Sequence, residues 1–222
     1  AVDYTASNGD PRTPASLHYL RNDGIMNSYE HAIHSIGSVI QEYDSDKMFP
    51  CYGFGARING QVMHNFALTF DPNNTEVQGV EGILTAYKRS LQSLQLYGPT
   101  LFAPVVNKVA NEVCQLESQS QHQSKICPYT ILMILTDGII TDMDHTIKAI
   151  VDASSLPLSI IIIGVGSADF SAMERLDGDD DKLSYHGKYA SRDIVQFVEL
   201  NNFFNIQTGV CRIVVEKEIR IF

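Results

Sequence analysis

Apolar residues change their spacing from one segment of the chain to the next. Residues 29–41, 80–94, 102–116 and 146–155 carry apolar side chains at helical spacing, which predicts amphipathic helices. Residues 1–3, 48–54, 129–135, 158–165 and 194–198 form short apolar runs, which predict strands. The two kinds of segment alternate along the whole chain.

This alternation predicts a doubly wound α/β fold. Right-handed crossovers between parallel strands place helices on both faces of a mostly parallel sheet. Asn59-Gly60 predicts a turn into a short strand over residues 62–68, which we expect at one antiparallel edge. No linker, repeat or low-complexity tract divides the 222 residues, so we expect one domain around a single core.

Charge narrows the kinds of partner that we expect, and cysteine content narrows the cellular compartment. The net charge of −10, without a Lys/Arg cluster, argues against nucleic acid or an anionic membrane surface as a direct partner. Because Cys51, Cys114, Cys127 and Cys211 show no C-x-x-C spacing, we expect free thiols in a reducing, intracellular compartment. The most apolar stretch, residues 156–165, is too short to cross a bilayer. The chain begins inside a predicted strand without an initiator Met, so we expect it to be part of a longer protein.

The first loop carries a candidate metal-ligand pattern, D-x-T-x-S. Asp3, Thr5 and Ser7 occupy alternate positions, so an extended backbone directs one carboxylate and two hydroxyls to the same side. A set of oxygen ligands with few carboxylates suits Mg²⁺ better than the many-carboxylate shell of Ca²⁺. Taken alone, the pattern is also typical of an ordinary turn or helix cap.

Two further segments supply candidate ligands. The apolar run at residues 129–135 leads into Thr136-Asp137-Gly138, which places a carboxylate at the carboxyl end of a buried strand. Thr100 lies in the loop before a predicted helix, where its hydroxyl can face an ion or cap that helix. Ligands bind parallel sheets outside the carboxyl ends of strands where the connection direction reverses. We therefore expect Asp3 and Asp137 to lie together on adjacent strands.

Other polar clusters are interpreted as structural. His31 and His34 share a predicted helix but have no Cys or acidic partner at ligand spacing. Residues 176–181 lack the glycine position of a calcium-binding loop, and we expect a solvated acidic loop there. Residues 164–166 lack the third glycine of a nucleotide loop and are interpreted as a strand exit. The chain has no G-x-S-x-G nucleophile elbow, so we expect no enzymatic activity.

Several segments resemble the von Willebrand factor A-type domain of the copines. They are VDYTASNGDP (2–11), YDSDKMFP (43–50), GFGAR (53–57), LQLYGPT (94–100), LTDGIITD (135–142), GVG (164–166), LDGDD (176–180) and RDIVQFV (192–198). The resemblance covers nearly all of residues 1–204. Residues 205–222 diverge from the closing helix that the family implies, and their β-branched content predicts an extended strand.

The resemblance implies a von Willebrand factor A-like, Rossmann-like domain with a metal-ion-dependent adhesion site. Matched position by position, Asp3, Thr5 and Ser7 fall in the first ligand loop of the family, Thr100 in the second and Asp137 in the third. The implied cofactor is Mg²⁺ or Mn²⁺. The implied parent protein binds phospholipid in response to Ca²⁺, through modules upstream of these residues.

The expected function is that of a metal-dependent adaptor in the cytoplasm. An Asp or Glu of a cytosolic client protein would complete the metal shell, and the upstream modules would recruit the parent protein to membranes. A metal-assisted hydrolase, which activates water at the same position, is one alternative. The other is the A-type domain of a copine-like plant ubiquitin ligase, although these residues contain no cysteine-rich zinc pattern.

Overall fold

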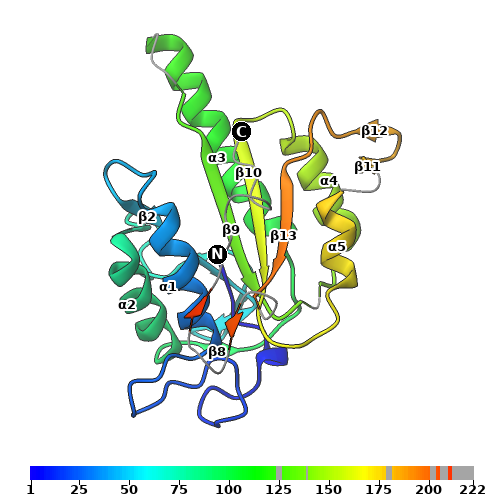
Figure 1. Cartoon of the computed structure of the whole chain (residues 1–222). Helices are drawn as coiled ribbons and strands as arrows, with labels where there is room; N and C mark the ends of the chain where they lie inside the picture. The colour runs from blue at the N-terminus through cyan, green and yellow to red at the C-terminus, as the bar shows by residue number, and fades with distance from the viewer. Residues whose placement is uncertain (124–126, 139, 179–181, 201–203, 206–209, 212–222) are drawn as a thin grey trace.

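A six-stranded sheet forms the centre of the computed structural model, which describes residues 1–123, 127–138, 140–178, 182–200, 204–205 and 210–211 (Figure 1). The strand order is β13 (Val195–Glu199), β10 (Leu158–Gly164), β9 (Thr130–Thr136), β1 (Val2–Asp3), β3 (Tyr52–Phe54) and β6 (Phe66–Ala67). Neighbouring strands are parallel, except that β6 runs antiparallel to β3 at the edge. The predicted mostly parallel sheet with one antiparallel edge strand is therefore confirmed.

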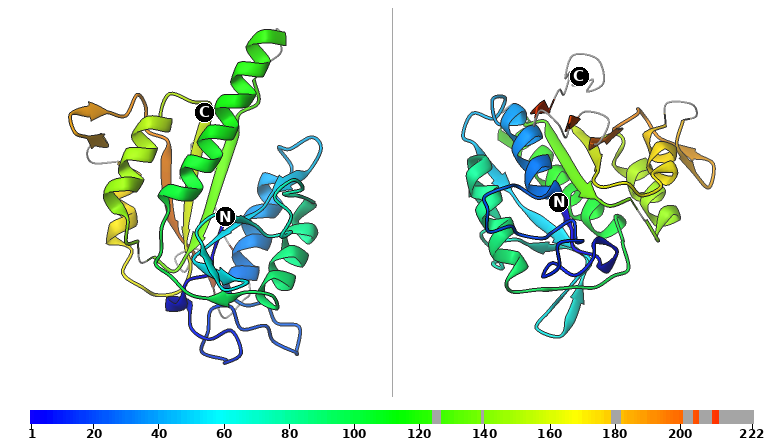
Figure 2. Two further views of the ribbon diagram at one scale, coloured as in Figure 1. Left: turned by 180° about the vertical axis from the view of Figure 1, so that it is seen from behind. Right: turned by 60° about the horizontal axis from the view of Figure 1, so that its bottom comes forward.

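Helices cover both faces of this sheet (Figure 2). Side chains of α1 (Ser28–Ile40) and α2 (Gly79–Leu91) pack on one face, where they meet Ile161 and Ile163 of β10. Side chains of α3 (Ala103–Gln123), α4 (Met143–Ala153) and α5 (Ser171–Asp177) pack on the other face, against Ile160 and Ile162. Alternate residues of a strand point to opposite faces, so the isoleucine run of β10 supplies both layers of the core.

Two of the predicted strands are each divided in the structure. Residues 48–54 split at Cys51 into β2 (Met48–Pro50), which pairs with β7 (Glu76–Gln78), and β3, which enters the central sheet. Residues 62–68 contain the end of β5 (Gln61–Met63) and then β6. The strand β5 pairs with β4 (Ala56–Ile58), which also pairs with β8 (Gln95–Leu96). Pro50 has no N–H group, and the change of partner follows it directly.

The interpretation of residues 176–181 as a solvated acidic loop is wrong at its beginning. Leu176 and Asp177 are buried in the last turn of α5, a helix that the apolar pattern did not predict. Gly178 ends this helix with a φ of 69°, which glycine adopts without steric cost. Residues 179–181 lie outside the described part of the chain.

The described residues also include two short hairpins near the end of the chain. The strands β11 (Ser184–Tyr185) and β12 (Lys188–Tyr189) pair with each other, as do β14 (Phe204–Asn205) and β15 (Val210–Cys211). Extended backbone at Asn205 and at Val210–Cys211 agrees with the prediction for residues 205–222. Residues 206–209 and 212–222 lie outside the described part, so the prediction is not tested there.

Candidate metal site at the carboxyl end of the sheet

Asp3 and Asp137 end two adjacent central strands. Val2 of β1 pairs with Leu135 of β9, so Asp3 is level with Thr136, and Asp137 follows directly. From β1 the chain crosses to β3 on one side, and β9 later joins β1 on the other side. The carboxyl ends of β1 and β9 therefore form the switch point of the sheet, where ligands of such folds bind. Asp3 and Asp137 therefore lie at the ends of adjacent strands, as expected from the sequence.

Asp3 accepts hydrogen bonds on both carboxylate oxygens. Its Oδ1 atom accepts from the Thr5 amide at 2.8 Å and from the Thr5 hydroxyl at 2.6 Å, and its Oδ2 atom accepts from the Thr136 hydroxyl at 2.7 Å. The Thr5 and Ser7 hydroxyl oxygens are 2.9 Å apart. Asp3 and Thr5 are buried whereas Ser7 is exposed. The side-chain oxygens of these three residues therefore form a series that extends from the interior to the surface.

Close contact with neighbouring loops fixes this ligand loop. Gly55 has a φ of 76°, and a Cβ atom at this position would lie 2.2 Å from the Thr5 Cγ2 atom. Glycine is therefore required for the loop to lie against β3. The Ala6 amide donates to the Tyr97 carbonyl at 2.7 Å, which ties the first ligand loop to the loop that contains Thr100. The residues that follow Thr5 continue as a short 3₁₀ helix, Ala6–Asn8.

Burial and like charge make the two carboxylates an unfavourable pair without a cation. Burial, and secondly the charge of Asp137, raise the pKa of Asp3 to about 7, although the hydrogen bonds from Thr5 and Thr136 oppose this shift. Asp137 is only 4% exposed. A divalent cation between the carboxylates would offset both effects, and this charge distribution fits the predicted Mg²⁺ or Mn²⁺.

The loop of Thr100 is held against the segment that follows Asp137. The Thr100 carbonyl accepts from the Thr141 amide at 3.0 Å and from the Thr141 hydroxyl at 2.8 Å. Thr100 was also a candidate cap for the next helix. However, the Asp142 carboxylate accepts from the Phe102 and Ala103 amides, both at 3.0 Å, and so caps the beginning of α3. The side chain of Thr100 is buried at this rim.

The candidate ligands are two carboxylates and three hydroxyls from three loops. In the described part of the chain, no group of three or more His, Cys, Asp or Glu side chains could hold a metal ion. A site of the predicted kind contains only two such side chains, because hydroxyls supply its other ligands. His31 is partly buried and His34 is exposed on α1. The assignment of Asp3, Thr5, Ser7, Thr100 and Asp137 as metal ligands stays a prediction.

Three residues that shape this site were not among the residues predicted from the sequence. Thr136 has a sequence signal, since it is a hydroxyl residue directly before Asp137 at the end of an apolar strand. Asp142 also has one, because it precedes a predicted helix, but the helix that it caps is α3. His18, whose ring contacts the Asp3 carbonyl, has no pattern that relates it to the ligand loop.

A mostly parallel α/β sheet with an antiparallel edge strand and oxygen side chains at its switch point is consistent with a von Willebrand factor A-like fold. A family model described as Copine matches residues 16–218. The chain belongs to the copine family. The match includes Thr100 and Asp137 and begins after the loop of Asp3, Thr5 and Ser7. Copine domains are typically non-catalytic protein-interaction domains.

Two further expectations concern thiols and membranes. Cys51, Cys114 and Cys127 are free cysteines, as their spacing predicted. None of the helices in the described part of the chain has the length and apolar character needed to span a bilayer.

Proposed function

We propose that this copine domain binds client proteins through a divalent cation at the carboxyl ends of β1 and β9. Asp3 and Asp137 would hold Mg²⁺ or Mn²⁺ directly or through water, and the hydroxyls of Thr5, Ser7 and Thr100 would supply neutral ligands. The observation that carries this proposal is the pair of buried carboxylates, because burial, and secondly the charge of Asp137, raise the pKa of Asp3. A buried pair of like charges favours binding of a cation.

The ligand composition supports an acidic partner. Two protein carboxylates balance the charge of a divalent cation, so a third carboxylate from a client meets no large excess of negative charge. The exposed Ser7 lies at the end of the oxygen series that begins at the buried Asp3, which provides a route from the site to the surface. When bound, the ion supplies the electrophilic position that a client Asp or Glu would occupy.

The same family relationship supports a cytoplasmic adaptor role for the parent protein. In that role, phospholipid-binding modules elsewhere in the parent respond to Ca²⁺ and bring the domain to a membrane, and the domain holds the client. The net charge of −10 opposes direct contact between this domain and an anionic membrane surface.

Calorimetric titration of Mg²⁺ and Mn²⁺ into the domain tests the proposal. We expect one site, and we expect Asp137→Ala to weaken the affinity by about a hundredfold or more, since it removes a charged ligand. Asp152→Ala is the matched control, because Asp152 pairs with Lys148 and Lys188 away from the site. Equal affinities of Asp137→Ala and wild type would contradict the proposed metal site.

Water-proton relaxation of the Mn²⁺ form tests for an open coordination position. We expect exchangeable water on the ion, and we expect a peptide with a central Glu to reduce the relaxation enhancement, whereas the same peptide with Gln does not. Release of product from phosphoesters or peptides under the same conditions would favour a metal-assisted hydrolase instead.

A further inference from the structure

A buried histidine lies against the main chain of the first ligand loop. The His18 side chain is fully buried, with its Nε2 atom 2.8 Å from the Asp3 carbonyl oxygen and its Nδ1 atom 2.8 Å from the Tyr87 hydroxyl. A carbonyl oxygen only accepts hydrogen bonds, so Nε2 carries the proton. Burial lowers the pKa of His18 to about 3, so the ring is neutral and Nδ1 accepts from Tyr87.

Neighbouring aromatic rings hold the imidazole in one plane. The Tyr29 ring stacks on it with a centroid distance of 4.1 Å and an interplanar angle of 19°. The Tyr4 ring stacks on it at 5.4 Å and 10°. Asn27 donates to the Tyr87 hydroxyl at 3.2 Å, which helps to orient the group that donates to Nδ1. Packing and hydrogen bonds together fix both the plane and the tautomer of His18.

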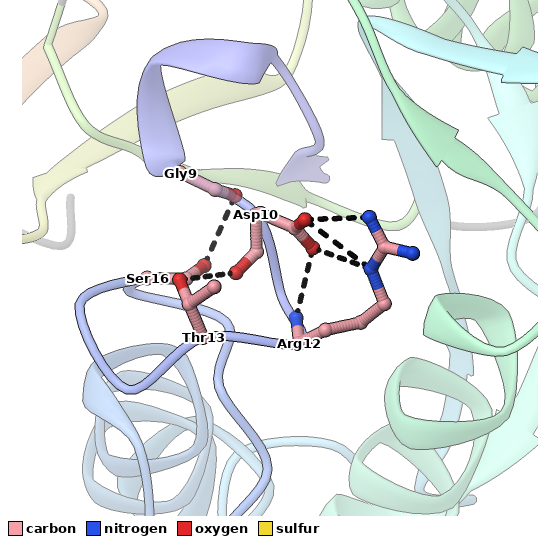
Figure 3. A network of polar contacts seen from close by, with 5 residues as sticks. All are labelled: Gly9, Asp10, Arg12, Thr13 and Ser16. Carbon is pink, nitrogen blue, oxygen red and sulfur yellow. Dashed lines mark hydrogen bonds and ion pairs between the residues drawn. The ribbon is translucent and has the colours of Figure 1, made fainter.

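A short network of hydrogen bonds connects the residues just after the ligand loop to the segment that contains His18. The Ser16 hydroxyl donates to the carbonyl oxygens of Asn8 at 3.0 Å and Gly9 at 3.1 Å. The same oxygen accepts from the His18 amide at 3.1 Å. Figure 3 shows the contact between Gly9 and Ser16 beside the hydrogen bonds of Asp10, which tighten the same loop. His18 therefore belongs structurally to the ligand loop although it lies outside the ligand motif.

A second main-chain group of the ligand loop is held in a similar way. The Asn8 side-chain amide donates to the Thr5 carbonyl at 3.2 Å, and its Oδ1 atom accepts from the Tyr29 hydroxyl at 2.7 Å. The carbonyls of Asp3 and Thr5 are thus both bound by side chains of residues 8–18, while the Asp3 carboxylate bonds the Thr5 and Thr136 hydroxyls.

We propose that His18 is a positioning residue for the metal site: its Nε2–H bond to the Asp3 carbonyl sets the main chain from which Asp3 and Thr5 present their oxygens. This inference rests on the proposed metal-binding function. Partners that orient metal ligands change affinity without touching the ion, because they order the ligands before binding. The hydrogen bond of His18, rather than the volume of its ring, carries this role.

Two substitutions separate the hydrogen bond from the ring. His18→Phe keeps an aromatic ring between Tyr4 and Tyr29 but removes the donor to Asp3, whereas His18→Gln keeps a donor and removes the ring. We expect His18→Phe to weaken Mn²⁺ binding about tenfold, and we expect His18→Gln to restore most of that loss. A role in packing alone predicts the reverse order, with the aromatic variant closer to wild type.

Hydrogen exchange of the Thr5 amide provides a readout that needs no metal. This amide donates to Asp3 Oδ1 at 2.8 Å, so it reports whether the ligand loop is ordered. We expect faster exchange in His18→Phe. Ser154→Ala is the matched control, since Ser154 is buried, donates to the Val151 carbonyl and accepts from the Ser191 amide away from the site. The control is expected to leave Thr5 exchange and Mn²⁺ affinity unchanged.

The outcomes distinguish this inference from the proposed function. Wild-type affinity and unchanged Thr5 exchange in His18→Phe overturn the positioning role. If the wild-type domain binds neither Mg²⁺ nor Mn²⁺, the proposed function fails, and Thr5 exchange alone decides whether His18 orders the loop. If His18→Phe does not fold, ¹⁵N spectroscopy of the wild-type ring decides, because a proton on Nδ1 instead of Nε2 overturns the inference.

Discussion

Burial has opposite energetic effects in the middle of the central sheet, where the buried side chains are apolar, and at the carboxyl ends of its strands, where they are carboxylates. In the middle of the sheet, Ile134, Ile160 and Ile162 are each 1% exposed, and burial of these apolar side chains favours folding. At the carboxyl ends, Asp3 and Asp137 are similarly buried, and their burial opposes the charged state. One sheet therefore provides both the stability of the domain and a place where charge is held unfavourably. A cation would relieve the second region without changing the first.

The largest expected effect is a dependence of metal-free stability on pH. The folded-state pKa of Asp3 is about 7 against an ordinary value of 3.8. The protonated carboxyl therefore contributes stability that is fully present below about pH 4 and is lost as pH rises through about 7, by on the order of 4 kcal/mol. Urea unfolding in EDTA, with wild type compared to Asp3→Asn, measures this contribution. We expect Mg²⁺ to restore stability above pH 7, and a constant difference between the two proteins would contradict the charge comparison.

A substitution in the apolar region is expected to affect stability alone. Ile162→Ala removes a buried side chain from the layer under α3 and α4, and we expect it to lower the free energy of unfolding by about 3 kcal/mol. Mn²⁺ affinity of the folded protein should stay within about twofold of wild type, since Ile162 lies in the interior of β10. Urea unfolding and calorimetry measure the two quantities, and a large loss of affinity would show that the two regions are coupled.

The smallest expected effect comes from the hydrogen bond between Thr136, at the end of β9, and the Asp3 carboxylate. Thr136→Val keeps the shape of the side chain but removes the hydroxyl that donates to Asp3 Oδ2 at 2.7 Å. We expect Mn²⁺ affinity to fall about tenfold, or about 1.4 kcal/mol, because Asp3 loses one of the groups that orient it. Thr130→Val, at the other end of β9, is the control. Equal calorimetric affinities of these two variants would argue against an orienting role for Thr136.

The fold could be predicted well from the sequence because its signals are local. Apolar spacing placed α1 to within one residue at each end, as well as the long strands β9 and β10. Short elements were harder, since β4, β8, β11 and β12 contain too few residues to show a period. The helix α5 was missed for a similar reason, because its seven residues span only two turns.

The placement of the candidate ligands was predictable where these residues form a pattern within one segment, although their role as ligands stays a prediction. Asp3, Thr5 and Ser7 follow the alternation of an extended chain, and Asp137 follows an apolar strand. The sheet rule then predicted that Asp3 and Asp137 would be neighbours, and the pairing of β1 with β9 brings them together. Among the supporting residues, Thr136 and Asp142 have sequence signals, whereas His18 has none. The capping role considered for Thr100 belongs to Asp142.

By itself the sequence determined the order of helices and strands, because the spacing of apolar residues requires no knowledge of distant partners. Only the tertiary structure decided that Thr136 donates to Asp3 across 133 residues and that His18 binds the Asp3 carbonyl. These contacts depend on which strands pair and how loops return over them. The burial of two carboxylates at one point follows from that packing, since their separation in sequence contains no information about their shared environment.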